Sequence, residues 1–140
     1  MKFSTIKSTG GYLPEKVVTN SDLEKILDTS DQWIRERTGI CQRHLAHDDE
    51  TSCDMAEIAA QRALDAAGMN PEEIGLIIVG TTTPDLVFPS TACLLQSRLG
   101  LPDCGAMDIN AACSGFLYAL SIADNYIRCG DVINALVIGV

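Results

Sequence analysis

Two short apolar runs constrain the fold of this chain of 140 residues more than any other feature of its sequence. Residues 76–79 read LIIV and residues 135–140 read ALVIGV, so neither run alternates with polar side chains. An uninterrupted apolar run of this length fits a strand that is buried on both faces, as parallel sheets covered by helices require. Segments of helical length alternate with these strands, which predicts βαβ units. The expected fold class is α/β, with a mostly parallel sheet and helices on both faces.

Capping residues and the positions of glycine and proline indicate the other elements. We expect an extended segment from Phe3 to Ser8 that ends at two glycines. Asn20 to Asp22 offer an N-cap for a short helix through Leu27. Further helices are expected over residues 30–38, 52–67, 90–99 and 114–129, with one helical turn at 71–73 and a strand at 105–110. The acidic residues 48–50 indicate a solvated loop.

The composition excludes several classes of protein. A hydrophobic content of 46% with 21% charged residues is typical of one folded domain. The net charge of −9 argues against nucleic acid as a partner, because binding phosphates needs a surplus of basic residues. No apolar run approaches the roughly 20 residues of a membrane span, and no signal-peptide core is present. Six cysteines without a C-x-x-C pair fit a reducing compartment, so we expect a soluble, cytoplasmic protein without a membrane partner.

One cluster invites a metal interpretation. Cys41, His44, His47 and Cys53 follow one another closely, but their spacing fits none of the common zinc patterns. We therefore expect surface histidines and no metal site.

The basic residues concentrate at the start of the chain. Seven of the ten lie within the first 43 positions. An anionic ligand is therefore expected to meet this early segment. The alternative is an amphipathic helix whose arginines form weak surface ion pairs.

The strongest chemical signal is residues 108–116, with the sequence DINAACSGF. A strand ends there, small residues make a tight turn, and a helix begins at or just after Cys113, as in the nucleophile elbow of hydrolases. The helix N-terminus is expected to lower the pKa of the thiol and so to favour the nucleophilic thiolate. The alternative is a buried cysteine that fills a small space. His44 and His47 lie in the acidic loop, and no pattern places either as a base beside Cys113.

Three ordered segments carry a resemblance to a known family. They are residues 29–40 (TSDQWIRERTGI), 88–93 (FPSTAC) and 110–116 (NAACSGF), and residues 10–14 and 75–82 agree with them. Together they resemble β-ketoacyl-acyl-carrier-protein synthase III of bacterial type II fatty acid synthesis. The resemblance runs from end to end of the chain but covers only the front part of the family's usual length. The apolar run that ends at Val140 also led us to expect the front part of a longer protein.

The resemblance implies a thiolase-like fold made of two similar halves, of which residues 1–140 would be the first. It implies that Cys113 accepts the acyl group and that Trp33 and Arg37 hold the nucleotide end of coenzyme A, with Thr29 nearby. It places Phe88 near the acyl pocket at a dimer interface. The catalytic histidine and asparagine of the family belong to the second half.

The implied reaction has two stages and uses no permanently bound cofactor. Cys113 takes the acyl group from a short acyl-coenzyme A, and malonyl-acyl carrier protein then loses carbon dioxide and attacks that group. The implied assembly is a homodimer. Two alternatives remain open at this point: a sister condensing enzyme of polyketide or quinolone-signal type, and a non-catalytic α/β binding module in which Cys113 is a packing residue.

Overall fold

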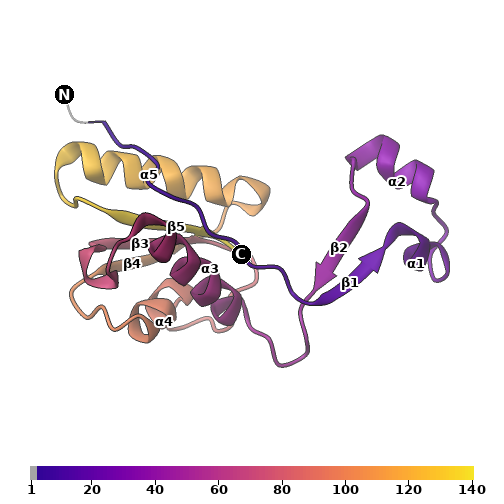
Figure 1. The fold of residues 1–140 in the computed structure, drawn as a ribbon, viewed down its shortest axis with the longest axis horizontal. Coiled ribbons are helices and arrows are strands. Elements are labelled where there is room, and N and C mark those ends of the chain that lie inside the picture. Colours follow the sequence, from indigo (N-terminus) through magenta and orange to yellow (C-terminus); the bar gives the residue numbers. More distant parts are fainter. Residues whose placement is uncertain (1–2) are drawn as a thin grey trace. The chain divides into compact units, whose positions relative to one another are not determined.

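The computed structural model describes residues 3–140, and Figure 1 labels its helices and strands. The chain forms two compact units. The larger unit consists of residues 51–140 together with residues 3–12, and the smaller unit is Leu13–Glu50. Each unit has a sheet of its own.

The larger unit is built on a parallel sheet of three strands. β3 (Leu76–Gly80) lies between β4 (Gly105–Ile109) and β5 (Ala135–Gly139), and both neighbours run parallel to it. Every residue of β3 is buried, which confirms the interpretation of the apolar run at 76–79. The register pairs Gly80 with Ile109 and with Gly139, so the carboxyl ends of the three strands are level.

Helices cover both faces of this sheet, as the sequence predicts (Figure 1). α3 (Ser52–Ala67) and α4 (Thr91–Arg98) pack on the face that contains Ile77 and Val79. α5 (Gly115–Cys129) packs on the other face, where its buried alanines contact the side of β3 that carries Leu76 and Ile78. The alternation of side chains along a strand explains why one five-residue strand serves two cores.

Two carboxylates from the larger unit bind the N-termini of its helices. Asp85 accepts hydrogen bonds from the backbone N–H groups of Ser52 (2.7 Å) and Cys53 (3.0 Å) at the start of α3. Asp108 at the end of β4 accepts from the first two N–H groups of α4, both at 2.8 Å. These N–H groups have no partner within their own helices, so the carboxylates satisfy them and fix where each helix begins. Thr51 also forms a capping box with Asp54 at the start of α3, where the sequence predicts the helix to begin.

The segment before residue 13 belongs to neither sheet. Residues 3–12 form no strand, because their polar groups bind helices instead of a sheet edge. Ser4 donates to Asp124 on α5, and Ser8 donates to the carbonyl of Ala63 on α3 at 2.6 Å. Gly10 lies directly on α3, where a Cβ atom would come within 2.4 Å of backbone atoms.

The smaller unit contains a hairpin of strands that the sequence did not predict. β1 (Lys16–Thr19) pairs antiparallel with β2 (Gln42–Leu45), so His44, which the sequence placed in the acidic loop, lies in a strand. α1 (Asn20–Glu24) and α2 (Asp31–Thr38) lie between these strands in the chain. The N-cap of α1 is Thr19, and Asp22 completes its capping box, so the predicted cap at residues 20–22 and the predicted end at Leu27 are corrected. Ser30 is the N-cap of α2, and the helix ends at a left-handed glycine.

The last strand also differs in detail from its prediction. Within residues 3–140, β5 pairs only with β3 and is an edge strand, and its burial alternates: Leu136 and Ile138 are buried, whereas Val137 is only partly covered. The predicted one-turn helix is the 3-10 turn Pro71–Glu73. No helix of residues 3–140 combines the length and the apolar character that crossing a membrane requires.

Candidate active site

Cys113 lies in the turn that connects β4 to α5, at the carboxyl end of the parallel sheet. The turn is one 3-10 segment, Ala112–Ser114, and α5 begins at Gly115 directly after it. The Cys113 side chain is exposed. This placement confirms the predicted strand–turn–helix arrangement, and within residues 3–140 the Cys113 thiol does not fill a buried space.

The residue before Cys113 has a conformation that is rare for anything but glycine. Ala112 has φ +46°, and it is the one non-glycine residue among residues 3–140 with a positive φ. A left-handed alanine costs roughly 1–2 kcal/mol relative to an ordinary backbone. Strained turns of this kind reverse the chain sharply and present the next side chain at the surface. The sequence contained no signal for this strain, because alanine rarely adopts it.

The other thiols differ from Cys113 in burial. Cys53 and Cys104 are buried, and burial raises the pKa of both thiols. Cys93 is partly covered, while Cys41 and Cys129 are exposed. Exposure alone therefore does not distinguish Cys113, but its place between a strained residue and a helix N-terminus does.

The predicted nucleotide-binding residues gather in the smaller unit. Thr29 and Trp33 line an open pocket of about 810 Å³ between α1 and α2, together with Leu27, Ile34 and Arg43. Trp33 is 53% exposed. The guanidinium carbon of Arg37 lies 5.2 Å from the centre of the indole ring, as residues four apart on a helix allow. The Oγ1 atom of Thr29 is buried and has no hydrogen-bond partner among the described residues.

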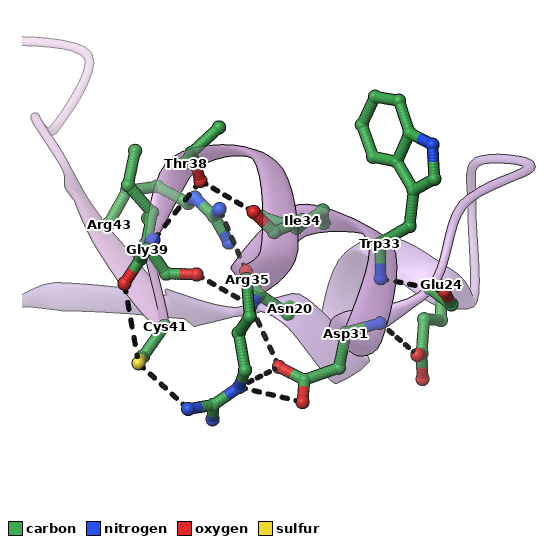
Figure 2. A network of polar contacts seen from close by, with 12 residues as sticks. Asn20, Glu24, Asp31, Trp33, Ile34, Arg35, Thr38, Gly39, Cys41 and Arg43 are labelled. Atoms are coloured by element: carbon green, nitrogen blue, oxygen red, sulfur yellow. Dashed lines mark hydrogen bonds and ion pairs between the residues drawn. The ribbon is translucent and has the colours of Figure 1, made fainter.

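A buried asparagine holds the walls of this pocket together (Figure 2). The amide nitrogen of Asn20 donates to Asp31 at the start of α2 and to the carbonyl of Ile40, both at 2.8 Å. Its amide oxygen accepts from Arg43 of β2 at 2.9 Å. One side chain thus connects α1, α2 and the hairpin. The sequence pattern at Asn20 indicates only a helix cap, because the partners of its side chain lie 11 to 23 residues away.

Phe88 and Cys113 lie in the larger unit, whereas both histidines lie in the smaller unit. Phe88 belongs to an exposed apolar loop of the larger unit, in which it is 88% exposed and Val87 is fully exposed. Cys113 is in the same unit, which contains no histidine. His44 and His47 are both in the smaller unit, where a ring nitrogen of His44 contacts the carbonyl of Pro14.

The cluster that invited a metal interpretation is divided between the units. Cys41, His44 and His47 belong to the smaller unit, whereas Cys53 is buried in the larger one. Within residues 3–140, no three histidine, cysteine, aspartate or glutamate side chains are grouped so that they would hold a metal ion.

Comparisons with known proteins agree with this geometry. Residues 107–140 match the family described as 3-oxoacyl-[acyl-carrier-protein (ACP)] synthase III. The chain is 62% identical over 137 residues to the β-ketoacyl-[acyl-carrier-protein] synthase III of Xanthomonas campestris pv. campestris (strain 8004), which covers 98% of this chain and 42% of that protein.

Two solved structures show the same likeness. The 3-oxoacyl-[acyl-carrier-protein] synthase III of Aquifex aeolicus superposes with a TM-score of 0.91 and 56% identity over 96% of this chain and 43% of that one. The priming β-ketosynthase of the R1128 polyketide pathway superposes with a TM-score of 0.87 and 37% identity over 94% of this chain and 39% of that one.

The parallel sheet is covered on both faces and a cysteine lies in the turn after β4, so the chain has the thiolase-like fold of these solved structures. The chain is similar to the amino-terminal part of β-ketoacyl-acyl-carrier-protein synthase III proteins. It spans about two fifths of the length of the curated relatives that it matches, 42% for the first of them.

Proposed function

We propose that residues 1–140 are the amino-terminal half of a β-ketoacyl-acyl-carrier-protein synthase III that starts fatty acid synthesis. The observation that carries this proposal is the exposed Cys113, which follows the strained Ala112 at the carboxyl end of the sheet. A second half would supply the histidine and asparagine that the family uses.

In the first stage, the Cys113 thiolate attacks the carbonyl carbon of a short acyl-coenzyme A. A carbon–sulfur bond to Cys113 forms, the bond to the sulfur of coenzyme A breaks, and coenzyme A leaves as a thiolate that takes up a proton. The thiol proton of Cys113 goes to a base, for which the family histidine is the candidate. Backbone N–H groups near the turn would stabilise the oxyanion of the tetrahedral intermediate.

In the second stage, malonyl-acyl carrier protein loses carbon dioxide, and the carbon–carbon bond that breaks leaves its electron pair on the thioester carbanion. The carbanion attacks the acyl group on Cys113. The new carbon–carbon bond gives the β-ketoacyl product, and the Cys113 thiolate leaves. The family histidine and asparagine would stabilise the enolate that precedes this attack.

The pocket of the smaller unit would bind the nucleotide end of coenzyme A. The indole of Trp33 offers a face for the adenine ring, and the guanidinium of Arg37 is a donor for phosphate. Thr29 brings a hydroxyl that lacks a partner within residues 3–140. Coenzyme A would be a substrate here, and no permanently bound cofactor or metal takes part in the proposed reaction.

The acyl-enzyme is the intermediate that tests this function. We expect acetyl-coenzyme A to add one acetyl group to the full-length protein, and peptide mapping to place it on Cys113. Cys113→Ala should abolish the addition, whereas Cys129→Ala, at another exposed cysteine, should leave it intact. An unmodified wild-type protein, or acetylation that persists in Cys113→Ala, would exclude Cys113 as the nucleophile.

Titration with coenzyme A tests the nucleotide site separately. Arg37→Ala and Trp33→Ala should each weaken binding by about tenfold, the equivalent of roughly 1.4 kcal/mol. Neither should change the alkylation of Cys113 by iodoacetamide. Arg128→Ala, which removes an exposed arginine of the larger unit, is the matched control and should bind normally. Unchanged affinity in both Arg37→Ala and Trp33→Ala would show that the nucleotide binds elsewhere.

The proposed partners include a second copy of the protein. The exposed loop with Leu86, Val87 and Phe88 is the candidate contact, because solvent exposure of three consecutive large apolar residues is unfavourable. Free cysteines and the acidic composition fit a cytoplasmic location. In the full-length protein, Phe88→Asp should shift sedimentation from dimer towards monomer.

A priming ketosynthase of a polyketide pathway is the second candidate, because one such structure superposes closely on this chain. The 62% identity to a fatty acid enzyme favours the first candidate. Analysis of the product made from acetyl-coenzyme A and malonyl-acyl carrier protein distinguishes the two.

A further inference from the structure

The first turn of α5 rests on the end of β3 through backbone atoms alone. Gly80 is the last residue of β3, and its Cα lies against Gly115 at the start of α5. A Cβ atom on Gly80 would lie 2.7 Å from the carbonyl carbon of Gly115 and 2.8 Å from the nitrogen of Phe116. Ordinary contacts of a Cβ atom begin near 3.4 Å. A single methyl group at Gly80 therefore forces the two elements apart by about 0.7 Å.

The end of β3 at Gly80 is held in place by hydrogen bonds to the chain on both of its sides. The carbonyl of Gly80 accepts a hydrogen bond from the N–H of Val140 at 3.1 Å. On the other side, the N–H of Thr81 donates to the carbonyl of Ile109 at 3.1 Å. β3 is also buried along its whole length between two packed cores. Any displacement must therefore occur in the first turn of α5.

That turn carries the reactive cysteine. Cys113 is two residues before Gly115, and the left-handed Ala112 leaves the chain little freedom to absorb a shift on the other side. We propose that Gly80 is a positioning residue for Cys113: the absence of a side chain at the end of β3 sets the distance between the sheet and the turn, and so the place of the thiol. This inference rests on the proposed function of Cys113.

Gly80→Ala in the full-length protein tests the role. Because a misplacement of about 1 Å can cost roughly 100-fold in rate, we expect the rate of Cys113 acetylation by acetyl-coenzyme A to fall by about 100-fold. The KM should stay within about threefold of wild type, since the proposed nucleotide site is in the smaller unit. A loss of folded protein would instead lower the number of reactive sites without changing the rate at each site.

Gly105→Ala is the matched control in the same sheet. Its Cβ would meet Cδ1 of Leu76 at 3.2 Å, which is the end of a flexible side chain, and it lies at the amino end of the sheet. This variant should be acetylated at the wild-type rate.

A milder variant keeps the proposal testable if Gly80→Ala does not fold. Gly139→Ala would place its Cβ 3.3 Å from that of Phe116, so it presses on the same turn with less force. We expect a rate between those of Gly80→Ala and Gly105→Ala. A rate within threefold of wild type for the folded Gly80 variant, or a rate for Gly139→Ala no lower than that of Gly105→Ala, would overturn the positioning role. Failure of the wild type to be acetylated would instead overturn the proposed function, and this role with it.

Discussion

At the scale of single residues, buried Asn20 holds the walls of the pocket together, and strained Ala112 shapes the turn that contains Cys113. Asn20 is 1% exposed and uses both ends of its amide. Hydrogen bonds from Arg35 and Asn20 hold the pKa of Asp31 below its usual range, so the start of α2 carries a carboxylate. In the larger unit, the left-handed backbone of Ala112 sets the direction of the chain just before Cys113. Neither residue carries out chemistry itself in the proposed reaction.

Replacement of Asn20 tests this view. Asn20→Ala removes the acceptor of Arg43 and the donor to Ile40, and buried polar groups without partners cost roughly 1–3 kcal/mol. We expect lower stability of the smaller unit and weaker coenzyme A binding by the full-length protein, measured by thermal unfolding and by titration.

Asn125→Ala is the control for this experiment, since the exposed amide of Asn125 bonds only within α5. It should change neither quantity. Coenzyme A affinity that is equal in wild type and Asn20→Ala would show that the network does not shape the pocket.

At the scale of elements, the parts that could be predicted from sequence are those whose signals are local. The apolar run of β3 and the caps of α2 and α3 depend on neighbouring residues, and the structure confirms them. The β1–β2 pair depends on contacts between strands whose closest residues, Thr19 and Gln42, are 23 positions apart, and both strands are short and half-exposed. Such strands have no pattern that a single sequence reveals.

In the candidate site too, local features could be predicted from the sequence and tertiary contacts could not. The residue types and the turn around Cys113 predicted its place, whereas the strain at Ala112 and the contact of Gly80 with Gly115 come from the meeting of three strand ends with a helix. Asp85 likewise binds residues more than 30 positions away. These are tertiary contacts, and local sequence carries no record of them.

An ion-pair network between α3 and α4 gives a prediction at this scale. Arg98 contacts Asp54 at 2.6 Å and Glu57 at 3.0 Å. Hydrogen bonds from Arg98 and from Thr51 lower the pKa of Asp54 from 3.8 to about 2. Between these two pH values, the unfolded chain binds a proton that the folded chain does not. The stabilisation is therefore complete above about pH 4 and is lost as the pH falls towards 2.

Arg98→Gln should lower the free energy of unfolding by about 1 kcal/mol or less at pH 7, because these side chains are more than a third exposed. The difference from wild type should shrink as the pH falls from 4 to 2. Urea unfolding at several pH values measures it. Arg128→Gln, which breaks a longer pair of 3.5 Å within α5, should have a smaller effect. A difference that stays constant down to pH 2 would contradict the assignment.

At the scale of the whole molecule, the chain has an open pocket in the smaller unit, where we propose that the nucleotide binds, and the turn with Cys113 in the larger unit. The sheet of the larger unit has two edges, because β4 and β5 each pair only with β3 within residues 3–140. Free strand edges are templates for association. The proposed second half and the second copy of the protein would both reduce the exposure of such surfaces.

Expression of residues 1–140 alone tests this expectation. We expect the isolated chain to self-associate in sedimentation experiments and to lack condensation at an enzymatic rate, although Cys113 acquires an acyl group slowly. A stable monomer with full turnover would contradict the proposal of two halves.

The formation of a β-ketoacyl product tests the central claim most directly. The full-length protein is incubated with acetyl-coenzyme A and malonyl-acyl carrier protein, and the carrier protein is analysed by mass spectrometry. We predict acetoacetyl-acyl carrier protein with the wild type and with Cys129→Ala, and none with Cys113→Ala. A product that forms equally well without Cys113, or no product with the wild type, would contradict the account.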